Sequence, residues 1–166
     1  MDTATFLVLA LTCAPQVDPH TTQALVAVES SGNPHAIGVV GGALVRQPRH
    51  QAEALATAKA LQAAGWDFSV GLVQINVRNL ARLGLSLEAA FEPCANLAAM
   101  QSVLNECFDR TDSAESGSDP KHRLRQALSC YYSGNPLTGF AHGYVRRVAQ
   151  AAGRQATDLP QPREKP

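Results

Sequence analysis

A single carboxylate, Glu29, stands at the end of an apolar segment where its ionised form is disfavoured. Asp18 followed by Pro19 is typical of a helix N-cap and a first helical position, and Gly32 with Asn33 marks the end of that helix. Glu29 therefore lies at the negative end of the helix dipole beside a buried face, and both effects raise a carboxyl pKa. A carboxyl that stays protonated near neutral pH can act as a general acid on a glycosidic oxygen. A glutamate near a helix end is more often a solvated surface residue, so this segment alone only nominates Glu29.

Two further segments strengthen the nomination. Residues 71–76 read Gly-Leu-Val-Gln-Ile-Asn, and residues 127–135 read Ala-Leu-Ser-Cys-Tyr-Tyr-Ser-Gly-Asn. Together with Glu-Ser-Ser-Gly-Asn-Pro at 29–34, and in this order, they resemble the three core motifs of the soluble lytic transglycosylase family of the lysozyme superfamily. The family patterns are roughly E-S-x-x-N-P, G-L-M-Q-I-N and A-Y-N-x-G. Three ordered motifs at compatible spacing make the resemblance specific, and it covers about residues 13–149.

Five other segments narrow the resemblance to the branch that serves type IV secretion and conjugation machines. They are residues 13–15, 36–39, 46–48, 93–97 and 139–145. Two positions depart from the family pattern. Tyr132 replaces the Asn that follows the motif tyrosine, which removes the hydrogen bonds that this Asn makes. Val73 replaces a Met or small residue before the motif glutamine, an apolar change that alters packing.

The resemblance implies cleavage of peptidoglycan between N-acetylmuramic acid and N-acetylglucosamine, without water and with one acid, Glu29. It implies substrate-binding roles for five other motif residues, which are Gly71, Gln74, Tyr131, Ser31 and Asn76. Four of them also have a structural interpretation. Gln74 can close its own loop, Tyr131 can be a core aromatic, Asn76 can cap the next helix, and Ser31 can shape the helix end. Gly71 is expected to permit close approach of the backbone to the ligand.

A conventional glycosidase needs a second carboxyl group, for which the sequence offers two candidates. Glu53 lies on a separate predicted helix, where a solvated face is its expected place. Asp67 precedes the second motif by four residues and could reach a cleft, although a turn or capping role after Gly65 is favoured. The three motifs hold no acid besides Glu29, which agrees with a substrate-assisted reaction. Neither a metal nor another cofactor is expected.

The pattern of apolar residues predicts a mainly α fold in one domain, residues 1–152, and the resemblance implies that this fold is lysozyme-like α+β. One β-hairpin is expected at 36–45, turning at Gly41-Gly42 and forming one wall of a sugar-binding groove. Residues 110–119 are the expected internal loop, and 153–166 a disordered C-terminal tail. Besides the helix that ends at Glu29, the predicted helices are 3–12, 51–64, 76–83, one that begins at Pro93, one that begins at Pro120, and 140–149.

The net charge and the N-terminal apolar run limit which classes of function the sequence allows. Fourteen basic and fourteen acidic residues cancel, which argues against a nucleic-acid partner. The apolar run at 6–11 is too short for a membrane span, and a truncated signal peptide is the alternative to a first helix there. The resemblance implies peptidoglycan strands and subunits of a type IV secretion system as partners. It also implies a periplasmic location, with no export signal evident.

Four cysteines, at positions 13, 94, 107 and 130, fit an oxidising compartment and two disulfides. Their spacing is unlike a zinc site, and buried free thiols are the alternative. Cys94 and Cys107 share a predicted helix about 20 Å apart, too far to bridge. If the next helix runs antiparallel, Cys130 comes level with Cys94. This favours Cys94–Cys130 with Cys13–Cys107, and Cys13–Cys94 with Cys107–Cys130 stays open.

The favoured function is thus a lytic transglycosylase that forms a 1,6-anhydromuramoyl product and opens the cell wall locally for a secretion or conjugation apparatus. Two alternatives remain at this stage. One is a hydrolytic muramidase or lysozyme, which needs a water-positioning group. The other is a catalytically inactive glycan-binding module, for which the change at Tyr132 would be a first sign.

Overall fold

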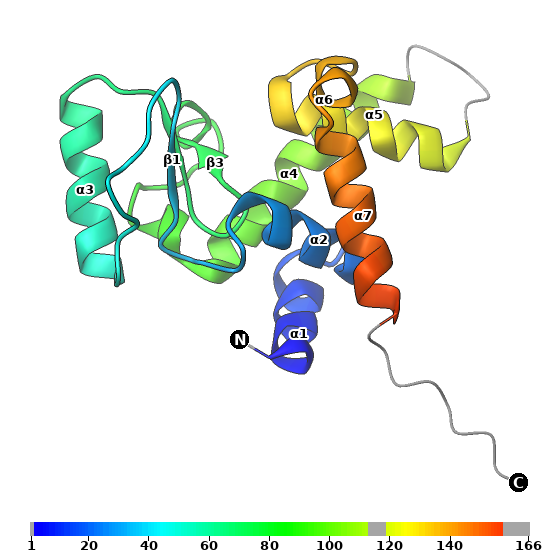
Figure 1. Cartoon of the computed structure of the whole chain (residues 1–166), viewed down its shortest axis with the longest axis horizontal. Coiled ribbons are helices and arrows are strands. Elements are labelled where there is room, and N and C mark those ends of the chain that lie inside the picture. Colours follow the sequence, from blue (N-terminus) through cyan, green and yellow to red (C-terminus); the bar gives the residue numbers. More distant parts are fainter. Residues whose placement is uncertain (1, 113–118, 158–166) are drawn as a thin grey trace, which may run out of the picture.

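A computed structural model describes residues 2–112 and 119–157 of the 166-residue chain. Helices dominate, as the sequence predicts, and a small antiparallel sheet lies to one side of them (Figure 1). The helices are α1 Thr3–Cys13, α2 Pro19–Glu29, α3 Gln51–Ala63, α4 Pro93–Asp112, α5 Pro120–Ser133, α6 Thr138–Ala141 and α7 Tyr144–Thr157. The strands are β1 Ile37–Val39, β2 Phe68–Val70 and β3 Ile75–Asn76.

The helix that carries Glu29 forms as its sequence predicts. The Asp18 side chain accepts hydrogen bonds from the backbone N–H groups of His20 and Thr21, and Pro19 takes the first helical position. Ser31 and Gly32 then both adopt left-handed backbone angles, with φ of 54° and 81°. These two residues end the helix, so Glu29 is the last residue of α2.

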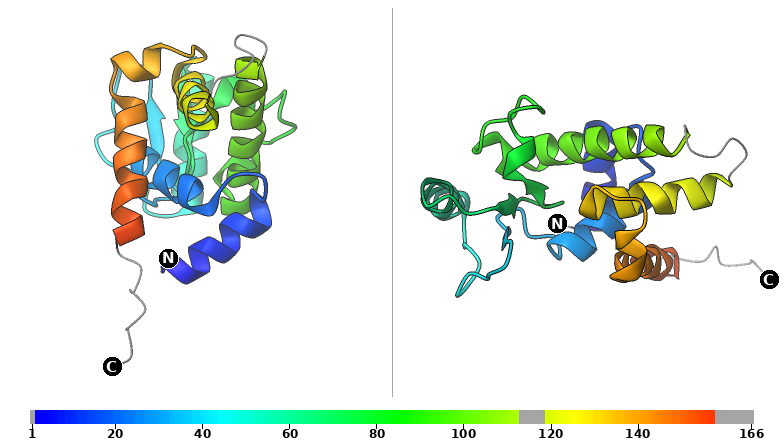
Figure 2. Two further views of the ribbon diagram at one scale, coloured as in Figure 1. Left: turned by 90° about the vertical axis from the view of Figure 1, so that its right-hand side faces the viewer. Right: turned by 90° about the horizontal axis from the view of Figure 1, so that it is seen from above.

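The helix α2 packs against α1 and, more extensively, against α7. The helices α4 and α5 pack against each other (Figure 2). The apolar core that joins these helices includes Leu25, Leu97, Met100 and Leu128. Among the described residues, no helix is long and apolar enough to cross a membrane.

The sheet forms differently from the expected hairpin at 36–45, and that prediction is wrong. β1 pairs with β2, with Ile37 opposite Val70 and Val39 opposite Phe68. The hairpin is instead β2–β3. Its turn is formed by residues 71–74 of the second motif. Phe68 and Val70 are fully buried, so core packing selects this later segment as the partner of β1.

The free edge of β1 is covered by a side chain. The amide of Gln47 accepts a hydrogen bond from the Ile37 N–H at 2.8 Å and donates one to the Ile37 carbonyl at 2.9 Å. This side chain therefore takes the place of one residue of a further strand. It gives the segment 46–48 a structural role beside the sheet.

Several predicted boundaries shift. The helix expected at 76–83 is only a short 3-10 turn, Val77–Asn79, followed by turns. The helix expected at 140–149 is divided into α6 and α7. α4 extends to Asp112, and the rest of the expected loop up to residue 118 lies outside the described residues. α7 continues to Thr157, so the domain limit at residue 152 falls within a helix, and the remainder of the predicted tail, 158–166, is also outside the described residues.

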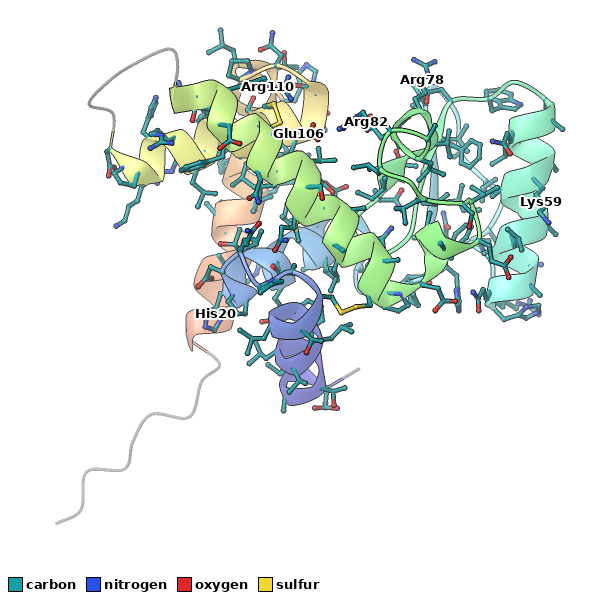
Figure 3. The ribbon with its side chains drawn as sticks, turned by 180° about the vertical axis from the view of Figure 1, so that it is seen from behind. His20, Lys59, Arg78, Arg82, Glu106 and Arg110 are labelled. Carbon is teal, nitrogen blue, oxygen red and sulfur yellow. A yellow bond between two sulfur atoms is a disulfide. The ribbon has the colours of Figure 1, made fainter. Side chains whose placement is uncertain are left out.

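Both disulfides form, but in the pairing that was not favoured. Cys13 bonds to Cys94 and Cys107 to Cys130, with Cα atoms 5.1 and 5.7 Å apart (Figure 3). α5 has 14 residues against 20 in α4, so it ends before it reaches the level of Cys94. Cys130 comes level with Cys107 instead, and Cys94, at the start of α4, faces the end of α1.

An ion pair links the segment after the sheet to the helical part. Arg82, in the turns that follow β3, donates from one nitrogen to both carboxylate oxygens of Glu106 on α4, at 2.6 and 2.7 Å (Figure 3). Both side chains are about half exposed, so the pair contributes little stability. The pair shows that the turns after β3 lie against α4.

Candidate active site

Glu29 lies where α2, α5 and α7 meet. Its carboxylate oxygen Oε1 accepts a hydrogen bond of 2.5 Å from the hydroxyl of Tyr144, the first residue of α7. Glu29 is partly buried, and the loss of water around its carboxyl raises its pKa to about 7, although the Tyr144 hydrogen bond and the positive charge of Arg147 both lower it. The sequence predicted this direction from burial. A carboxyl with this pKa is protonated in a large fraction of molecules at neutral pH, as a general acid must be.

Tyr131 brings the second and third motifs together beside Glu29. Its hydroxyl donates a 2.6 Å hydrogen bond to the carbonyl of Val73, in the turn between β2 and β3. Burial raises the pKa of Tyr131 well above its usual value, and the negative charge of Glu29 raises it further. The phenol therefore stays neutral, and it acts here as a donor to the turn, not to the carboxyl of Glu29.

Tyr144 is the site residue that sequence reasoning missed. It reads as one of several apolar-face residues in a C-terminal helix, and it is 2% exposed, as a core residue would be. Burial and the Glu29 charge both raise its pKa, so its hydroxyl keeps the proton that it donates. The only signal available was a tyrosine within 139–145, one of the segments that carry the branch resemblance.

The side chain of Asn96 forms hydrogen bonds with the turn of the second motif. Its fully buried amide accepts from the Val73 N–H at 2.9 Å and donates to the carbonyls of Val70 and Ala90 at 3.0 and 2.8 Å. Both backbone groups of Val73 are thus in use, one toward Asn96 and one toward Tyr131. This explains why an apolar replacement at position 73 is compatible with the motif, because the turn uses the backbone of this residue.

Gly71 and Gln74 have structural roles in the same turn. Gly71 has a φ of 84°, and a Cβ there would lie 2.3 Å from the Asn96 amide nitrogen, so the close approach that Gly71 permits is to Asn96. The Gln74 amide donates to the carbonyls of Ala36 and Gly71, at 3.1 and 3.0 Å. It therefore closes the loop, and its predicted contact with substrate stays a prediction.

Asn76 and Asp67 also pair within the protein. The Asn76 side chain accepts from the Arg78 N–H, which makes it the cap of the short 3-10 turn, and donates to Asp67 at 2.8 Å. Arg78 lies 3.1 Å from the other oxygen of Asp67. Asp67 directly precedes β2, and both of its carboxylate oxygens are paired within the protein. The other candidate, Glu53, pairs with Arg46, and this partner lowers the pKa of Glu53 to about 2.

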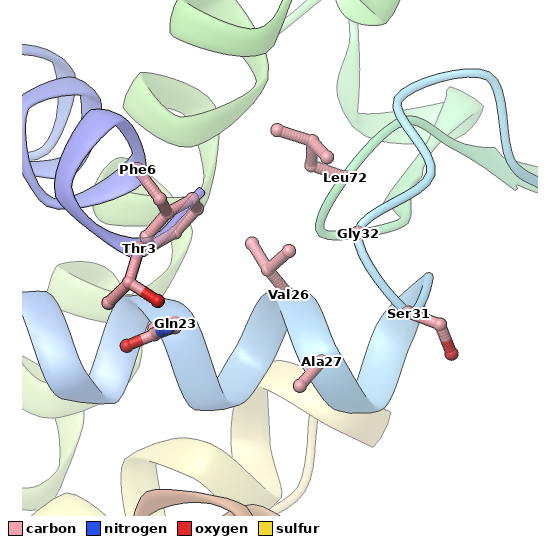
Figure 4. Close-up of a pocket in the computed structure, with 8 residues that line it drawn as sticks. All are labelled: Thr3, Phe6, Gln23, Val26, Ala27, Ser31, Gly32 and Leu72. Atoms are coloured by element: carbon pink, nitrogen blue, oxygen red, sulfur yellow. The ribbon is translucent and has the colours of Figure 1, made fainter. Parts of the chain in front are cut away.

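A cavity of about 500 Å³ opens between α1, α2 and the turn after β2 (Figure 4). The apolar residues Phe6, Val26, Ala27 and Leu72 line it, together with Gly32 and the polar residues Thr3, Gln23 and Ser31. Of the predicted substrate-binding residues, Ser31 lines this cavity. Among the described residues, no group of three or more His, Cys, Asp or Glu side chains could hold a metal ion.

Comparison with known proteins places this arrangement in a family. The model of the Transglycosylase SLT domain matches residues 6–152. The type IV secretion system protein virB1 of Brucella suis is 47% identical over 152 residues, which is 89% of this chain and 63% of that protein. The protein virB1 of Agrobacterium fabrum is 37% identical over 151 residues, 90% of this chain and 60% of that protein.

The chain therefore spans 60–63% of the length of these relatives. No significant match to a solved structure is found. Because the family match runs through α1 to α7 and includes Glu29, Tyr131 and Tyr144, the conclusion is that this chain belongs to the SLT transglycosylase family.

Proposed function

We propose that the chain is a peptidoglycan lytic transglycosylase that cleaves the β-1,4 bond between N-acetylmuramic acid and N-acetylglucosamine. The observation that carries the proposal is the carboxyl of Glu29, with its pKa raised to about 7 by burial and its position fixed by the Tyr144 hydroxyl. The family match through residues 6–152 supports the same reaction class.

One carboxyl group is sufficient for the proposed chemistry. Protonated Glu29 gives its proton to the glycosidic oxygen as the bond to muramoyl C1 breaks, and the substrate's own N-acetyl group stabilises the positive charge that develops. The resulting Glu29 carboxylate then takes the proton of the muramoyl 6-hydroxyl while O6 bonds to C1. This closes the 1,6-anhydro ring and returns Glu29 to its protonated form, so no water is consumed.

The surroundings of Glu29 support this single-acid reaction. Asp67 and Glu53, the two other carboxylates considered, are held by Arg78 and Arg46. The groups that act on the pKa of Glu29 are a tyrosine and an arginine of α7, not a second acid. A conventional two-carboxylate mechanism would need such an acid about 5–10 Å away.

The test is digestion of purified peptidoglycan, with mass spectrometry of the sugar ends. Wild-type protein should release 1,6-anhydromuropeptides, and Glu29→Gln should lose at least about 10²-fold in rate, since general acid catalysis contributes about 10²–10⁴-fold. The matched control is Glu88→Gln. Glu88 is an exposed carboxylate that follows the β2–β3 hairpin in the sequence, and its replacement should leave activity unchanged. Reducing ends would instead establish hydrolysis, and binding without turnover would establish a glycan-binding module.

We also propose that this activity opens the wall locally for a type IV secretion system in the periplasm. Two observations support the setting. The relatives at 47% and 37% identity are named for virB1 proteins, the first of them as a type IV secretion system protein. The two disulfides fit an oxidising compartment. The partners would be peptidoglycan strands and secretion-system subunits. Secretion by cells that carry only Glu29→Gln should fall if the wall must be opened enzymatically.

A further inference from the structure

Tyr132, the residue that departs from the family pattern, packs directly on the tyrosine that holds Glu29. The rings of Tyr132 and Tyr144 are stacked, with centroids 4.6 Å apart and an interplanar angle of 19°. Tyr132 is 41% exposed, whereas Tyr144 is 2% exposed. Tyr132 therefore covers the ring of Tyr144 and lies between this ring and solvent.

A second contact fixes Tyr132 itself. The ring of His142 meets it edge-on at 5.9 Å, and the Tyr132 hydroxyl lies 3.3 Å from His142 Nδ1. Arg147 in turn donates to the carbonyl of His142 at 3.1 Å, with its guanidinium 5.8 Å from the Tyr144 ring. The start of α7 and the end of α5 are thus joined by one connected set of side chains.

We propose that Tyr132 is a positioning residue, which acts through the ring of Tyr144 to hold the hydroxyl of Tyr144 on the carboxyl of Glu29. The proposal rests on the proposed function of Glu29 as the acid. An asparagine at position 132, as in the family pattern, could offer hydrogen bonds but no stacking face. The tyrosine provides stacking in place of those hydrogen bonds.

The hydroxyl of Tyr144 stays on Glu29 only if the Tyr144 side chain is held in place. A phenol that donates at 2.5 Å must keep its χ1 angle, because rotation about χ1 swings the hydroxyl away from its acceptor, whereas rotation about χ2 leaves the oxygen on the axis of the ring. The stacked ring of Tyr132 blocks movement of the Tyr144 ring toward that side, so it restricts the χ1 swing. The titratable and charged groups that act on Glu29 are Tyr131 on α5 and Tyr144 and Arg147 on α7. Among them, Tyr144 is the one that Tyr132 contacts in the stack.

The test compares three variants of the full chain. Tyr132→Leu removes the stacking ring, and Tyr132→Phe keeps the ring while it removes the hydroxyl. Phe140→Leu is the control, because Phe140 is 40% exposed on the neighbouring helix α6 and is also aromatic. Two readouts are used: kcat and KM on peptidoglycan, and the carboxyl titration of Glu29 followed by 13C NMR, with Glu29→Gln to assign the signal.

In Tyr132→Leu, we expect kcat to fall about five- to tenfold with KM changed less than twofold, the effect on rate of losing one aromatic pair. We also expect the titration of Glu29 to move to higher pH, because the hydrogen bond from Tyr144 that lowers its pKa is weakened. Tyr132→Phe should recover at least half of the wild-type kcat and the wild-type titration. Phe140→Leu should change neither.

The proposal is overturned if Tyr132→Leu leaves both kcat and the Glu29 titration unchanged. It is also overturned if only KM rises, since Tyr132 would then contact the sugar directly. The NMR titration needs no turnover. A shift in Tyr132→Leu, in a protein whose wild type releases no anhydro product, would therefore sustain the positioning role while it refuted the proposed function.

Discussion

Tyr144 donates its hydroxyl proton to the carboxyl of Glu29 across 115 positions of the sequence, and so joins the first residue of α7 to the last residue of α2. The contact places a neutral donor on a carboxyl whose pKa is raised by burial. Because the donor favours the charged form and burial the neutral form, the pKa of Glu29 settles near 7 instead of higher. A group that must first give and then accept a proton works best with a pKa near the pH of its surroundings.

The first prediction concerns the pH dependence of activity. The acid form of Glu29 starts the reaction, so kcat/KM should fall on the alkaline side with an apparent pKa of about 7. Tyr144→Phe should move this alkaline limb to higher pH, because it removes the hydrogen bond that lowers the pKa, and should reduce kcat by about tenfold through lost orientation. A pH–rate profile of the two proteins checks this. An alkaline limb that is unmoved, or moved to lower pH, would contradict the role given to Tyr144.

The second prediction concerns stability in the Glu29→Gln variant. The pKa of Glu29 is raised from 4.5 to about 7, so the folded state binds more protons than the unfolded state between these values. Glu29 therefore lowers the free energy of unfolding as pH rises from about 4.5 to 7, and the full cost remains above pH 7. Glu29→Gln removes this cost and should be more stable than wild type at pH 8, by an amount on the order of 1–3 kcal/mol.

The check is thermal unfolding of both proteins at pH 4 and pH 8. At pH 4 the wild-type carboxyl is protonated in both states, so the two melting temperatures should lie close together. A variant that is less stable than wild type at pH 8 would show that the Glu29 carboxylate is favourably solvated in the folded protein. It would refute the buried-acid interpretation.

The sequence was sufficient where the determinants are local. The cap at Asp18, the proline at 19 and the break at Gly32 are neighbours in the chain, and they placed Glu29 correctly at the end of α2. The family pattern identified the turn of the second motif and Tyr131, and the structure brings both together. The prolines at 93 and 120 likewise predicted the first residues of α4 and α5.

Features that depend on distant pairing could not be found in this way. β1 has three residues, too few for a pattern to choose between Gly41-Gly42 and a partner at 68–70. The disulfide pairing depended on the relative offset of α4 and α5, which no local signal gives. The sequence placed Tyr144 among the apolar residues of a C-terminal helix. Only the three-dimensional structure shows that its hydroxyl donates a hydrogen bond to Glu29.

The third prediction separates two explanations for Gly71. Gly71→Ala and Gly84→Ala both place alanine at a positive φ, but a Cβ at Gly84 has open space, whereas one at Gly71 meets Asn96 and the carbonyl of Ala90. Gly84→Ala should cost about 1–2 kcal/mol from backbone strain alone. Gly71→Ala should cost at least about 2 kcal/mol more, because the turn and Asn96 must separate.

Urea unfolding without any glycan measures both costs. If Gly71→Ala were no less stable than Gly84→Ala but failed to bind peptidoglycan, the glycine would serve the ligand, as the family resemblance implies. The structure favours the first result, since the atoms within reach of a Cβ at this position belong to the protein.

The last prediction concerns the disulfides. Cys13–Cys94 closes a loop of 81 residues and Cys107–Cys130 one of 23. In the unfolded-state entropy model the longer loop is worth about 1 kcal/mol more, so the double variant Cys13→Ala/Cys94→Ala should be less stable than Cys107→Ala/Cys130→Ala.

Activity should show the opposite order at a temperature where both variants are folded. Cys130 precedes Tyr131, whose hydroxyl holds the turn at Val73, so release of this bridge loosens α5 beside Glu29. Cys13–Cys94 fastens α1 to the start of α4, away from that contact. Unfolding curves and peptidoglycan turnover of the two variants test both orders, and peptide mapping of the oxidised protein verifies the pairing. A mapped Cys94–Cys130 bridge, or equal activities in the two folded variants, would refute the coupling between the second bridge and the site.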